Sequence, residues 1–290
     1  MKNFIFNILA CPRCKNRLII KPQRDIFCKN CSSHYKFKGN LPFLLTPESQ
    51  KYIQDDLKSQ TGQKMINRYG KKIMKIINFL RPPSPLLHFD NSRIMKIIAT
   101  HNGEKTKVLS IGGGGKEPKR FPTMINLNID AFPNVDIIGD AHNVPLLDNS
   151  LDGIICNAVL EHLRDPYLAV KEMRRILKRG GYVYTEVPFI QPYHGYPRDY
   201  QRYTLFGLEN LFSFEGFSKI ESGVVSGPSS TISHLTRDYL SSLFPNKNFQ
   251  IFIKDVAGWI LFPLKYLDVL LNKRNDHSLA SGVYFFGRKT

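Results

Sequence analysis

Apolar runs and helical periods alternate through the central part of the chain. Five apolar, β-branched runs predict strands, at 107–111, 124–130, 135–141, from 151 onward, and 182–189. Residues 166–181 place apolar side chains at helical spacing and end in two glycines, which predicts an amphipathic helix closed by glycine. The later runs 219–227 and 282–289 predict two more strands. Strands that alternate with helical patterns are typical of an α/β protein with a parallel sheet.

The pattern changes on either side of this central part. Residues 47–88 combine apolar positions at a roughly helical period with interspersed lysines and arginines, and the run 81-RPPSP-85 ends the helical pattern. This predicts a basic helical linker, whose cations either form the solvated face of a packed helix or contact lipid headgroups or RNA. Near the other end, residues 228–280 form an apolar insertion before the last strand, and we expect it to be helical.

The apolar insertion is too interrupted to cross a membrane. Its centre, 249–271, has only nine uncharged residues between Asp255 and Lys265, whereas a transmembrane helix needs about 20. An apolar hairpin bent at Pro263 and carrying Trp259 could instead lie in the membrane interface. A helical cap on the sheet and a dimer surface are the alternatives.

The charge of the chain favours the membrane interpretation. With 42% hydrophobic and 22% charged residues, the 290-residue chain has the composition of a globular protein. Its net charge is +17, and residues 1–81 carry 17 basic against 4 acidic side chains. This excess predicts a polyanionic partner, for which we favour an anionic membrane surface over nucleic acid. Residues 1–10 lack the apolar stretch of a signal peptide, so we expect a cytoplasmic protein, peripheral on the inner face of the membrane.

Four of the five cysteines form two Cys-x-x-Cys pairs with thirteen residues between them, namely Cys11, Cys14, Cys28 and Cys31. Two such pairs can complete a tetrahedral shell of four thiolates around a structural Zn²⁺ ion, whose binding would supply folding energy to a small module. A rubredoxin-type iron site and a redox dithiol are the alternatives. The pattern L-x-C-P-x-C…L…C-x-x-C…Y…G-x-P-x-L-L resembles the small zinc ribbons that activate tRNA and protein methyltransferases, which implies a zinc ribbon over residues 1–46.

Four consecutive glycines begin at Gly112, directly after the first central strand. Open α/β sheets bind ligands at the carboxyl ends of their strands, and glycine lets a ligand approach the backbone there. The dinucleotide fingerprint fails because Glu117 stands at its third glycine, and no Gly-Lys-Ser/Thr closes a P-loop. The next two strands end in Asp130 and Asp140. The first acid is placed to accept hydrogen bonds from ribose hydroxyls, and the second suits an adenine amino group.

This succession resembles the class I S-adenosylmethionine (SAM)-dependent methyltransferases. The residues that carry the resemblance are Gly112, Gly114, Asp130, the triplet Gly139-Asp140-Ala141, Asn157, Glu161-His162 and the helix-to-strand junction 175–181. The resemblance implies SAM as the cofactor. It also implies a Rossmann-like, seven-stranded methyltransferase sheet with helices on both faces, over residues 89–290.

The resemblance also implies roles for single residues. Gly112 and Gly114 would form the floor of the cofactor pocket, and Asp130 would hold the ribose. Asp140 and Ala141 would flank the adenine, and Asn157 would face the amino acid of the cofactor. Two features depart from the family. Ser110 stands where the family usually has an acid, and residues 116–123 leave a first crossover helix very short or missing.

Candidates for the methyl-acceptor site follow the fifth strand. The segment 189-FIQPYHGYPRDYQRYT-204 resembles part of bacterial methyltransferases from surface-glycan gene sets. His194 is the first candidate for a general base, and Asp199 could orient it. Arg202 could grip an acidic substrate or lock the loop. The candidate substrate contacts are Tyr200, Arg202 and Tyr203. An ordered, tyrosine-rich lid is the structural alternative.

His162, after the fourth strand, is the second candidate base, although a histidine there often caps the following helix. Together the sequence predicts a SAM-dependent methyltransferase that O-methylates a glycan, a lipid-linked molecule or another membrane-proximal small substrate. An RNA methyltransferase and a non-catalytic, methyltransferase-like binder or activator are the alternatives.

Overall fold

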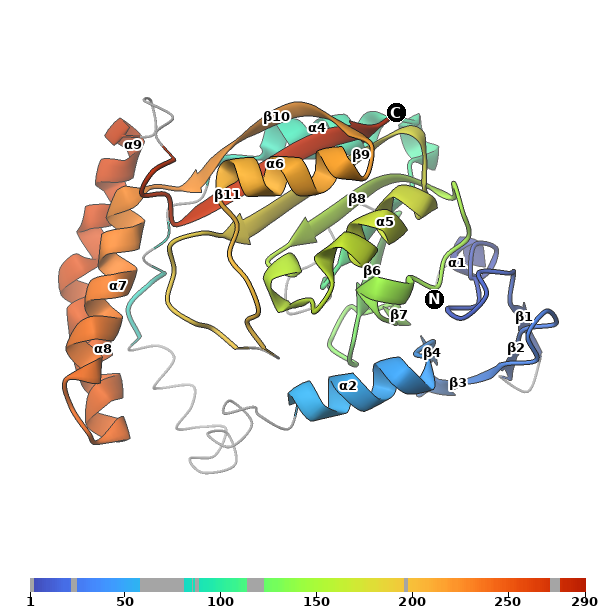
Figure 1. Ribbon diagram of the computed structural model, residues 1–290, viewed down its shortest axis with the longest axis horizontal. Coiled ribbons are helices and arrows are strands. Elements are labelled where there is room, and N and C mark those ends of the chain that lie inside the picture. The colour runs from blue at the N-terminus through green and yellow to red at the C-terminus, as the bar shows by residue number, and fades with distance from the viewer. Residues whose placement is uncertain are drawn as a thin grey trace.

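The computed structural model describes residues 3–21, 25–57, 81–84, 86, 89–113, 123–195, 198–271 and 277–290. Within them, eleven strands form one mixed sheet in the order β1-β2-β3-β4-β7-β6-β5-β8-β9-β11-β10 (Figure 1). The strands are β1 (Ile19–Ile20), β2 (Ile26–Phe27), β3 (His34–Lys38), β4 (Leu41–Phe43), β5 (Val108–Ile111), β6 (Met124–Asn128), β7 (Ile137–Ile138), β8 (Leu151–Asn157), β9 (Leu177–Pro188), β10 (Phe217–Ser226) and β11 (Gly282–Lys289). The longer helices are α2 (Pro47–Leu57), α4 (Ser92–Thr100), α5 (Pro166–Ile176), α6 (Leu205–Phe214), α7 (Pro228–Ser242) and α8 (Lys247–Leu261). The short helical turns are α1 (Asn3–Phe6), η1 (Gly103–Lys105), η2 (Ala141–Asn143), η3 (Leu160–His162), η4 (Phe262–Leu267) and α9 (Asp268–Leu271).

The strands that follow residue 107 are arranged as in a doubly wound sheet. β7, β6, β5, β8 and β9 are parallel. Counted in sequence from β5, they have the spatial order 3-2-1-4-5, which is that of Rossmann folds. β11 then lies antiparallel between β9 and β10. The predicted Rossmann-like α/β architecture is confirmed, and the carboxyl ends of the parallel strands lie along one edge.

The prediction of a seven-stranded sheet is wrong, because the strands of the amino-terminal module join the same sheet. β4 pairs in parallel with β7 through Phe43 and Ile138. The Leu44 N–H donates a hydrogen bond to the Ile138 carbonyl at 2.8 Å. β3, β2 and β1 continue from β4 by antiparallel pairing. The module therefore covers an edge at which β7 would otherwise expose unpaired backbone groups.

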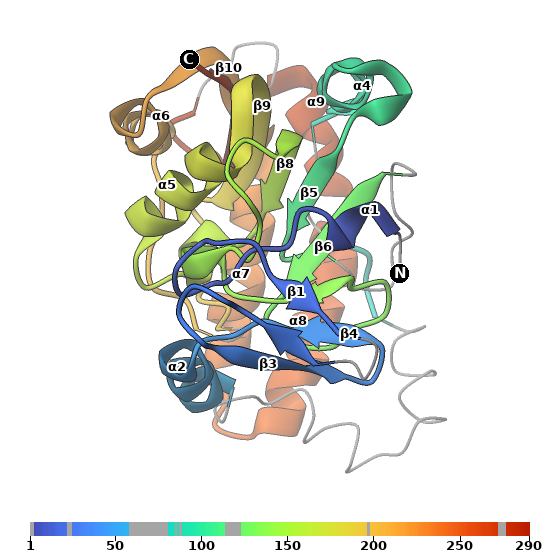
Figure 2. The same ribbon diagram turned by 90° about the vertical axis from the view of Figure 1, so that its right-hand side faces the viewer.

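Helices cover both faces of the sheet (Figure 2). α5 and α6 pack on the face to which Leu109 and Ile111 of β5 contribute. α4 packs on the opposite face, to which Val108 of the same strand contributes. The alternation follows from the two-residue period of a strand. Because both faces are covered, the central strands are apolar throughout, which is the pattern that made them recognisable in the sequence.

The helix predicted over 166–181 ends five residues early, and its two glycines lie in a strand. Its last residue is Ile176, and Leu177 begins β9, where it is fully buried and pairs with Leu151 of β8. The Ser150 N–H donates to the Ile176 carbonyl at 2.9 Å. The turn before β8 thus satisfies a carbonyl at the helix end, which needs no glycine cap.

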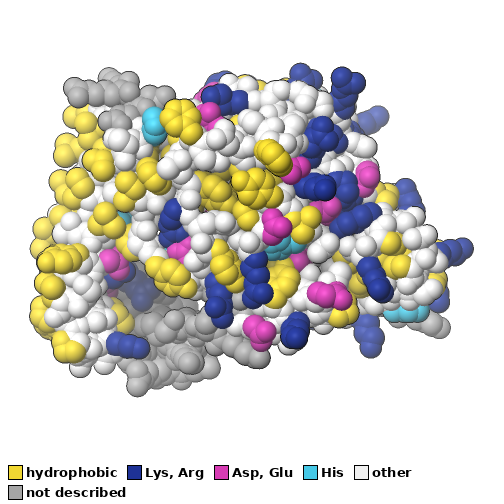
Figure 3. Space-filling model, viewed as in Figure 1, with side chains coloured by type: hydrophobic (Ala, Val, Ile, Leu, Met, Phe, Trp, Pro, Cys, Tyr) yellow, Lys and Arg dark blue, Asp and Glu magenta, His cyan; other side chains and the backbone are white. Residues whose placement is uncertain are grey.

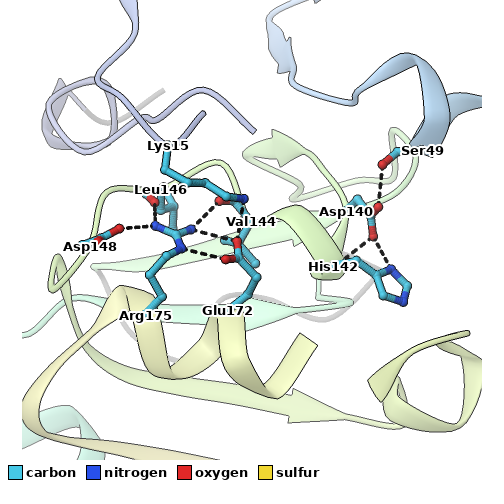
Figure 4. Close-up of polar contacts among 9 residues, drawn as sticks. All are labelled: Lys15, Ser49, Asp140, His142, Val144, Leu146, Asp148, Glu172 and Arg175. Atoms are coloured by element: carbon cyan, nitrogen blue, oxygen red, sulfur yellow. Dashed lines mark hydrogen bonds and ion pairs between the residues drawn. The ribbon is translucent and has the colours of Figure 1, made fainter. Parts of the chain in front are cut away.

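The amino-terminal module shares one apolar core with the rest of the protein. Leu9, Cys11 and Leu44 are fully buried in the same cluster as the central strands and α5. A polar contact joins the same parts, because the Lys15 ammonium forms an ion pair with the Glu172 carboxylate of α5 at 2.8 Å (Figure 4). The module is therefore an integral part of the fold.

Helices α7, α8 and α9 occupy the predicted insertion and stand together at one end of the molecule (Figure 1). The chain leaves α8 through η4, which begins with Phe262 and Pro263. The buried Asp268 carboxylate accepts hydrogen bonds from the Ser229 and Ser230 N–H groups, which ties α9 to the start of α7. Hydrophobic side chains crowd the outer margin of these helices (Figure 3). No helix in the described part of the chain is long and apolar enough to cross a membrane.

Some predicted features fall on residues that the structure does not describe. Of the basic linker predicted over 47–88, the structure describes α2 and a few residues after 80. The lysine-rich stretch 58–80, Gly114 and residues 116–122 of the short crossover lie outside the described residues.

Candidate functional site

The backbone at the tip of β5 leaves no room for side chains. Gly112 has a φ of +76°, and a Cβ on it would lie 2.4 Å from Val159 Cγ2. A Cβ on Gly113 would lie 2.4 Å from Ser110 Oγ. The Asn128 side-chain amide donates to the carbonyls of both glycines at 3.0 Å. Glycine is therefore required here by conformation and by close approach.

Gly112, Asp130, Asp140 and Ala141 line one cavity of about 310 Å³. It lies at the carboxyl edge of the parallel strands, where open α/β sheets bind ligands, and its volume is that of a small-molecule site. The other walls come from α2, the tip of β6 and the loops after β7, β8 and β9. They include Tyr52, Leu127, Asn128, Phe132, His142, Ala158, His162, Arg164 and His194.

Ser110 and Asn157 lie in β5 and at the end of β8, and neither lines this cavity. The Asn157 Oδ1 atom is buried and accepts no hydrogen bond from the described residues. Ala158, the next residue, lines the cavity and has a φ of +52°. A non-glycine residue in this left-handed region is strained, and such strain concentrates at functional sites.

The Asp140 carboxylate is buried and held by several partners (Figure 4). Oδ1 accepts a hydrogen bond from the His142 N–H at 2.9 Å and lies 2.7 Å from His142 Nδ1. Oδ2 accepts from the Ser49 hydroxyl at 2.6 Å and from the Tyr52 hydroxyl. Burial would raise the pKa of this carboxyl, but the contacts with His142, Ser49 and Tyr52 outweigh burial and hold it below its usual value. Asp140 therefore stays ionised and fixes Tyr52 in the cavity wall.

The Asp130 carboxylate is more open. Its Oδ1 accepts from the Ala131 N–H at 2.7 Å and forms an ion pair with the Lys38 ammonium of β3 at 3.1 Å. The side chains of Lys38 and Asp130 are 58% and 41% exposed, so a ligand can displace this pair at little cost. Lys38 of the amino-terminal module therefore contacts the cavity wall at Asp130, and α2 contacts it at Asp140.

Sequence reasoning missed Tyr52 and Lys38. They lie 88 and 92 residues from the carboxylates that they contact, and no local pattern links residues so far apart. The one related signal in the sequence is the resemblance of residues 1–46 to methyltransferase activators. That resemblance does not identify the residues that contact the cavity.

The two candidate bases lie together in the cavity wall. His162 Nε2 and His194 Nε2 are 3.7 Å and 3.6 Å from the same atom, Glu161 Oε1. The two imidazole rings meet edge to face with centroids 4.9 Å apart. Glu161 is fully buried behind them. The structure therefore brings together both histidines predicted as candidate bases, around a carboxylate for which no role was predicted.

Asp199 and Arg202 hold the loop that carries His194. Asp199 Oδ2 accepts from the His194 backbone N–H at 2.9 Å. The Arg202 guanidinium pairs with Asp199 and also donates to the Pro192 carbonyl at 3.1 Å. Burial would raise the pKa of Asp199, but Arg202 and the His194 N–H outweigh burial and hold it below its usual value. In this structure Arg202 locks the loop, which is one of its two predicted roles.

The two candidate substrate tyrosines differ in their surroundings. Tyr200 is exposed, and its hydroxyl accepts from Arg164 Nε at 3.0 Å. The Tyr203 hydroxyl is buried and has no hydrogen-bond partner among the described residues. Burial, followed by the nearby Glu161 carboxylate, raises the pKa of Tyr203. The Tyr203 hydroxyl therefore joins the two Glu161 carboxylate oxygens as buried polar atoms without a hydrogen-bond partner among the described residues.

The four cysteines of the ribbon converge. Their Sγ atoms all lie within 4.8 Å of one another, with 3.5 Å between Cys11 and Cys31 and 3.4 Å between Cys14 and Cys28. Thiolates about 2.3 Å from a tetrahedral Zn²⁺ ion lie about 3.8 Å apart. The cluster is therefore compatible with one zinc ion. The fifth cysteine, Cys156, is buried in β8, and burial raises its pKa.

Comparison with known proteins supports a methyltransferase. Residues 120–185, which include Asp130, Asp140 and Glu161, match a family model described as a methyltransferase domain. An uncharacterized methyltransferase of Schizosaccharomyces pombe is 30% identical over 79 residues, which cover 27% of this chain and 28% of that protein. An uncharacterized 37.1 kDa protein in transposon Tn4556 of Streptomyces fradiae is 44% identical over 51 residues, 17% of this chain and 15% of that protein. The chain thus spans less than a third of the length of these curated relatives.

Among solved structures, this chain is similar to phosphoethanolamine N-methyltransferase 2 of Haemonchus contortus in complex with SAM. The TM-score is 0.42 and the identity is 18%, over 68% of this chain and 52% of that one. The family match, the strand order and the residues of the cavity together support a SAM-dependent methyltransferase.

Proposed function

We propose that the protein transfers the methyl group of SAM to an oxygen of a membrane-proximal small substrate, such as a glycan or a lipid-linked molecule, at the cytoplasmic face of a membrane. The observation that carries the cofactor assignment is the convergence of Gly112, Asp130 and Asp140 on one cavity. A bare strand tip flanked by two carboxylates on neighbouring strand tips is what an adenosyl group with a free ribose requires.

When bound, SAM would supply an electrophilic methyl group on its sulfonium centre. Gly112 and Gly114 would lie beneath the cofactor, and Asp130 would accept hydrogen bonds from the ribose hydroxyls in place of Lys38. Asp140 and Ala141 would border the adenine. Tyr52 would add a wall on that side, since Asp140 already holds its hydroxyl at the cavity.

The remaining cofactor contacts would come from the tips of β5 and β8. Asn157 does not line the cavity, but its buried Oδ1 has no hydrogen-bond partner among the described residues, and the ammonium of the cofactor's amino acid would be a suitable one. Ser110 would leave that ammonium without the carboxylate that the family usually places there. A modest loss of cofactor affinity is the consequence.

The acceptor would enter beside the two histidines that line the cavity. Transfer to an oxygen needs an acceptor in line with the methyl group and a group that takes up the hydroxyl proton. His194 is the more accessible histidine, with 44% of its side chain exposed against 12% for His162. Asp199 would position His194 through the loop, and Tyr200, Arg202 and Tyr203 would border the acceptor.

The membrane-proximal class of substrate is supported by the outer surface of α7, α8, η4 and α9. Contiguous exposed apolar side chains of this kind mark interaction sites or membrane interfaces. The exposed side chains are Ile232, Leu235, Tyr239, Leu243, Phe249, Phe252, Val256, Trp259, Ile260, Tyr266, Leu267, Val269 and Leu270. The net charge of +17 would add attraction to anionic lipids.

Isothermal calorimetry with SAM tests the cofactor assignment. We expect one SAM to bind per chain, and Asp130→Ala should weaken binding at least about tenfold, because two ribose hydrogen bonds worth roughly 1 kcal/mol each are lost. Glu104→Ala, an exposed carboxylate on η1, is the matched control and should leave the affinity unchanged. No SAM binding to the wild-type protein would favour a non-catalytic binder instead.

Sedimentation with lipid vesicles tests the substrate class. The protein should pellet with vesicles of anionic phospholipid at 0.15 M salt, and a structured RNA at the same salt should not compete for the protein. Tight RNA binding without pelleting would overturn the membrane-proximal substrate and favour an RNA methyltransferase.

A further inference from the structure

Glu161 is a buried carboxyl group without hydrogen-bond partners among the described residues. Its side chain is fully buried, and neither carboxylate oxygen accepts a hydrogen bond from the described residues. Burying an ionised carboxylate costs several kcal/mol unless a cation or hydrogen-bond donors compensate. Other carboxylates at this site, Asp140 and Asp199, have such donors. The contrast indicates that Glu161 has a partner outside the described residues.

The two histidines face Glu161 at the spacing of metal ligands. Their Nε2 atoms lie 3.7 Å and 3.6 Å from Glu161 Oε1, which is too far for a hydrogen bond. Two ligands that each lie about 2.0–2.2 Å from one metal ion are separated by roughly 3.0–3.7 Å across ordinary coordination angles. The three ligand atoms lie within 4.8 Å of one another. One ion between them would contact all three.

The second nitrogen of His162 is arranged as in metal sites, whereas that of His194 lies too far from a carboxylate for a hydrogen bond. His162 Nδ1 lies 2.5 Å from the Arg198 carbonyl oxygen, which can only accept, so Nδ1 carries the proton. In the neutral ring, Nε2 then carries a lone pair 3.7 Å from Glu161 Oε1, and a metal ion between the two atoms would make that contact favourable. On the other ring, His194 Nδ1 lies 3.8 Å from Asp199 Oδ2. Metal-ligating histidines commonly hold a carbonyl or a carboxylate through the second nitrogen.

We propose that Glu161, His162 and His194 bind one divalent transition-metal ion, distinct from the ion of the cysteine cluster. Two imidazoles and one carboxylate form a ligand set that leaves coordination positions open. Both histidines line the cavity, so the open positions face the place of the methyl acceptor. An oxygen of the acceptor would bind there. This last step rests on the proposed function, whereas the metal site does not. His194 would then hold the ion instead of taking the acceptor's proton; the ion would lower the pKa of a bound hydroxyl, and its proton would pass to solvent.

Titration with Mn²⁺ of the full-length protein carrying one zinc equivalent tests the site, with free and bound Mn²⁺ distinguished by electron paramagnetic resonance. Mn²⁺ suits imidazole and carboxylate ligands, and thiolates select zinc, so the cysteine cluster should not take up the probe. We expect one Mn²⁺ per chain. His194→Ala and Glu161→Gln should each weaken Mn²⁺ binding at least about tenfold with the zinc content unchanged. His101→Ala, which changes an exposed histidine at the carboxyl end of α4, should bind Mn²⁺ like the wild-type protein.

His194→Ala keeps the test decisive if Glu161→Gln fails to fold, because His194 is 44% exposed. Absence of Mn²⁺ uptake below 1 mM, or equal uptake by His194→Ala, would overturn the site and favour protonated histidines as the partners of Glu161. Calorimetry with SAM on the same samples separates the two proposals. If SAM binds and Mn²⁺ does not, the proposed metal site is wrong and the proposed methyltransferase activity stands. If Mn²⁺ binds and SAM does not, the proposed activity is wrong and the metal site stands.

Discussion

At one edge of the sheet the amino-terminal module buries its apolar side chains, and at the end of the molecule α7, α8 and α9 leave many of theirs in solvent. Leu9, Cys11 and Leu44 of the ribbon are fully buried, whereas Trp259 and Ile260 of α8 are 51% and 71% exposed. Both segments are additions to the same doubly wound sheet. The difference shows that the amino-terminal module belongs to the core of the fold, whereas the helices leave apolar side chains exposed on the described part of the chain.

The polar contacts of the two regions differ in the same way. The ribbon and α2 reach buried carboxylates of the sheet domain, through Lys15 to Glu172 and through Ser49 to Asp140 (Figure 4). On the helices, the pair between Lys254 and Asp238 is 42% and 35% exposed. Buried ion pairs are costly to break, and exposed ones contribute little. Five substitutions or sets of substitutions test this contrast, from the largest expected effect to the smallest.

Cys11→Ser combined with Cys28→Ser should have the largest effect. Loss of a structural metal belongs to the changes that cost more than about 4 kcal/mol. Because the ribbon shares the core of the sheet domain, one cooperative thermal transition should shift as a whole, measured by calorimetry together with metal content. Cys156→Ala, a buried cysteine outside the cluster, should keep one zinc per chain. A separate low-temperature transition for the ribbon alone would show that the ribbon folds independently, and iron in the wild-type protein would overturn the zinc assignment.

Glu172→Gln should destabilise the protein by about 3 kcal/mol, because the Lys15 and Arg175 cations lose the buried carboxylate that they share. Urea unfolding at pH 7 measures the change. Asp238→Asn is the matched change on α7 and should cost less than about 1 kcal/mol, since its partner Lys254 is exposed. Equal losses in the two variants would contradict the contrast between a buried and an exposed region.

Acid should weaken the helical region through His234 of α7. Burial, followed by the charge of Arg237, lowers the pKa of His234 from 6.5 to about 4. Between these values the unfolded chain binds a proton that the folded protein does not, so stability falls as the pH falls through this window. We expect a contribution of about 2 kcal/mol between pH 7 and 4.5. His234→Gln should remove that part of the pH dependence in urea unfolding. An unchanged profile would show that His234 titrates normally.

Those three tests concern groups buried by contacts between distant parts of the chain. The same long-range contacts limit how much of the structure the sequence can predict. The central strands and the convergence of Asp130 and Asp140 were predictable, because apolar strands buried on both faces and acids at strand tips are local signals. The end of α5 was not. Gly180 and Gly181 read as a helix stop, but Leu177 is drawn into β9 by its pairing with Leu151, a contact 26 residues away in sequence.

The pairing of the amino-terminal module with the sheet could not be predicted either, because it also joins residues far apart in the sequence. The pairing of Phe43 with Ile138 joins a strand of three residues to one of two, and such short edges carry no periodicity. The surroundings of Glu161 were equally unpredictable. Its neighbour His162 follows in sequence, but His194 lies 33 residues further along on a loop fixed by Asp199. Local sequence patterns therefore pointed to Asp130, Asp140 and the two histidines, but not to the distant residues that contact them.

Ile260→Glu tests the outer surface directly. The side chain is 71% exposed, so thermal stability should change by less than about 0.5 kcal/mol. Burial of an isoleucine in a membrane interface contributes about 1.5 kcal/mol or more, so sedimentation with anionic vesicles should weaken at least about tenfold. Phe214→Glu, an 81% exposed side chain at the end of α6, is the control and should pellet like the wild-type protein. An equal loss of vesicle binding in both variants would show that the added negative charge weakens binding, and not the loss of the Ile260 side chain.

Lys38→Ala should have the smallest effect and addresses the ribbon where it meets the cavity. Its ion pair with Asp130 is half exposed, so the loss of stability should stay below about 1 kcal/mol. SAM affinity measured by calorimetry should increase by up to about fivefold, because Asp130 no longer has to break an ion pair with Lys38 before it accepts hydrogen bonds from the ribose. Lys36→Ala, on the same strand, is the control, since Lys38 is the lysine of β3 that pairs with Asp130. A tenfold weakening by Lys38→Ala would instead place the lysine in direct contact with the cofactor, and the ribbon would then be part of the binding site as well as of the fold.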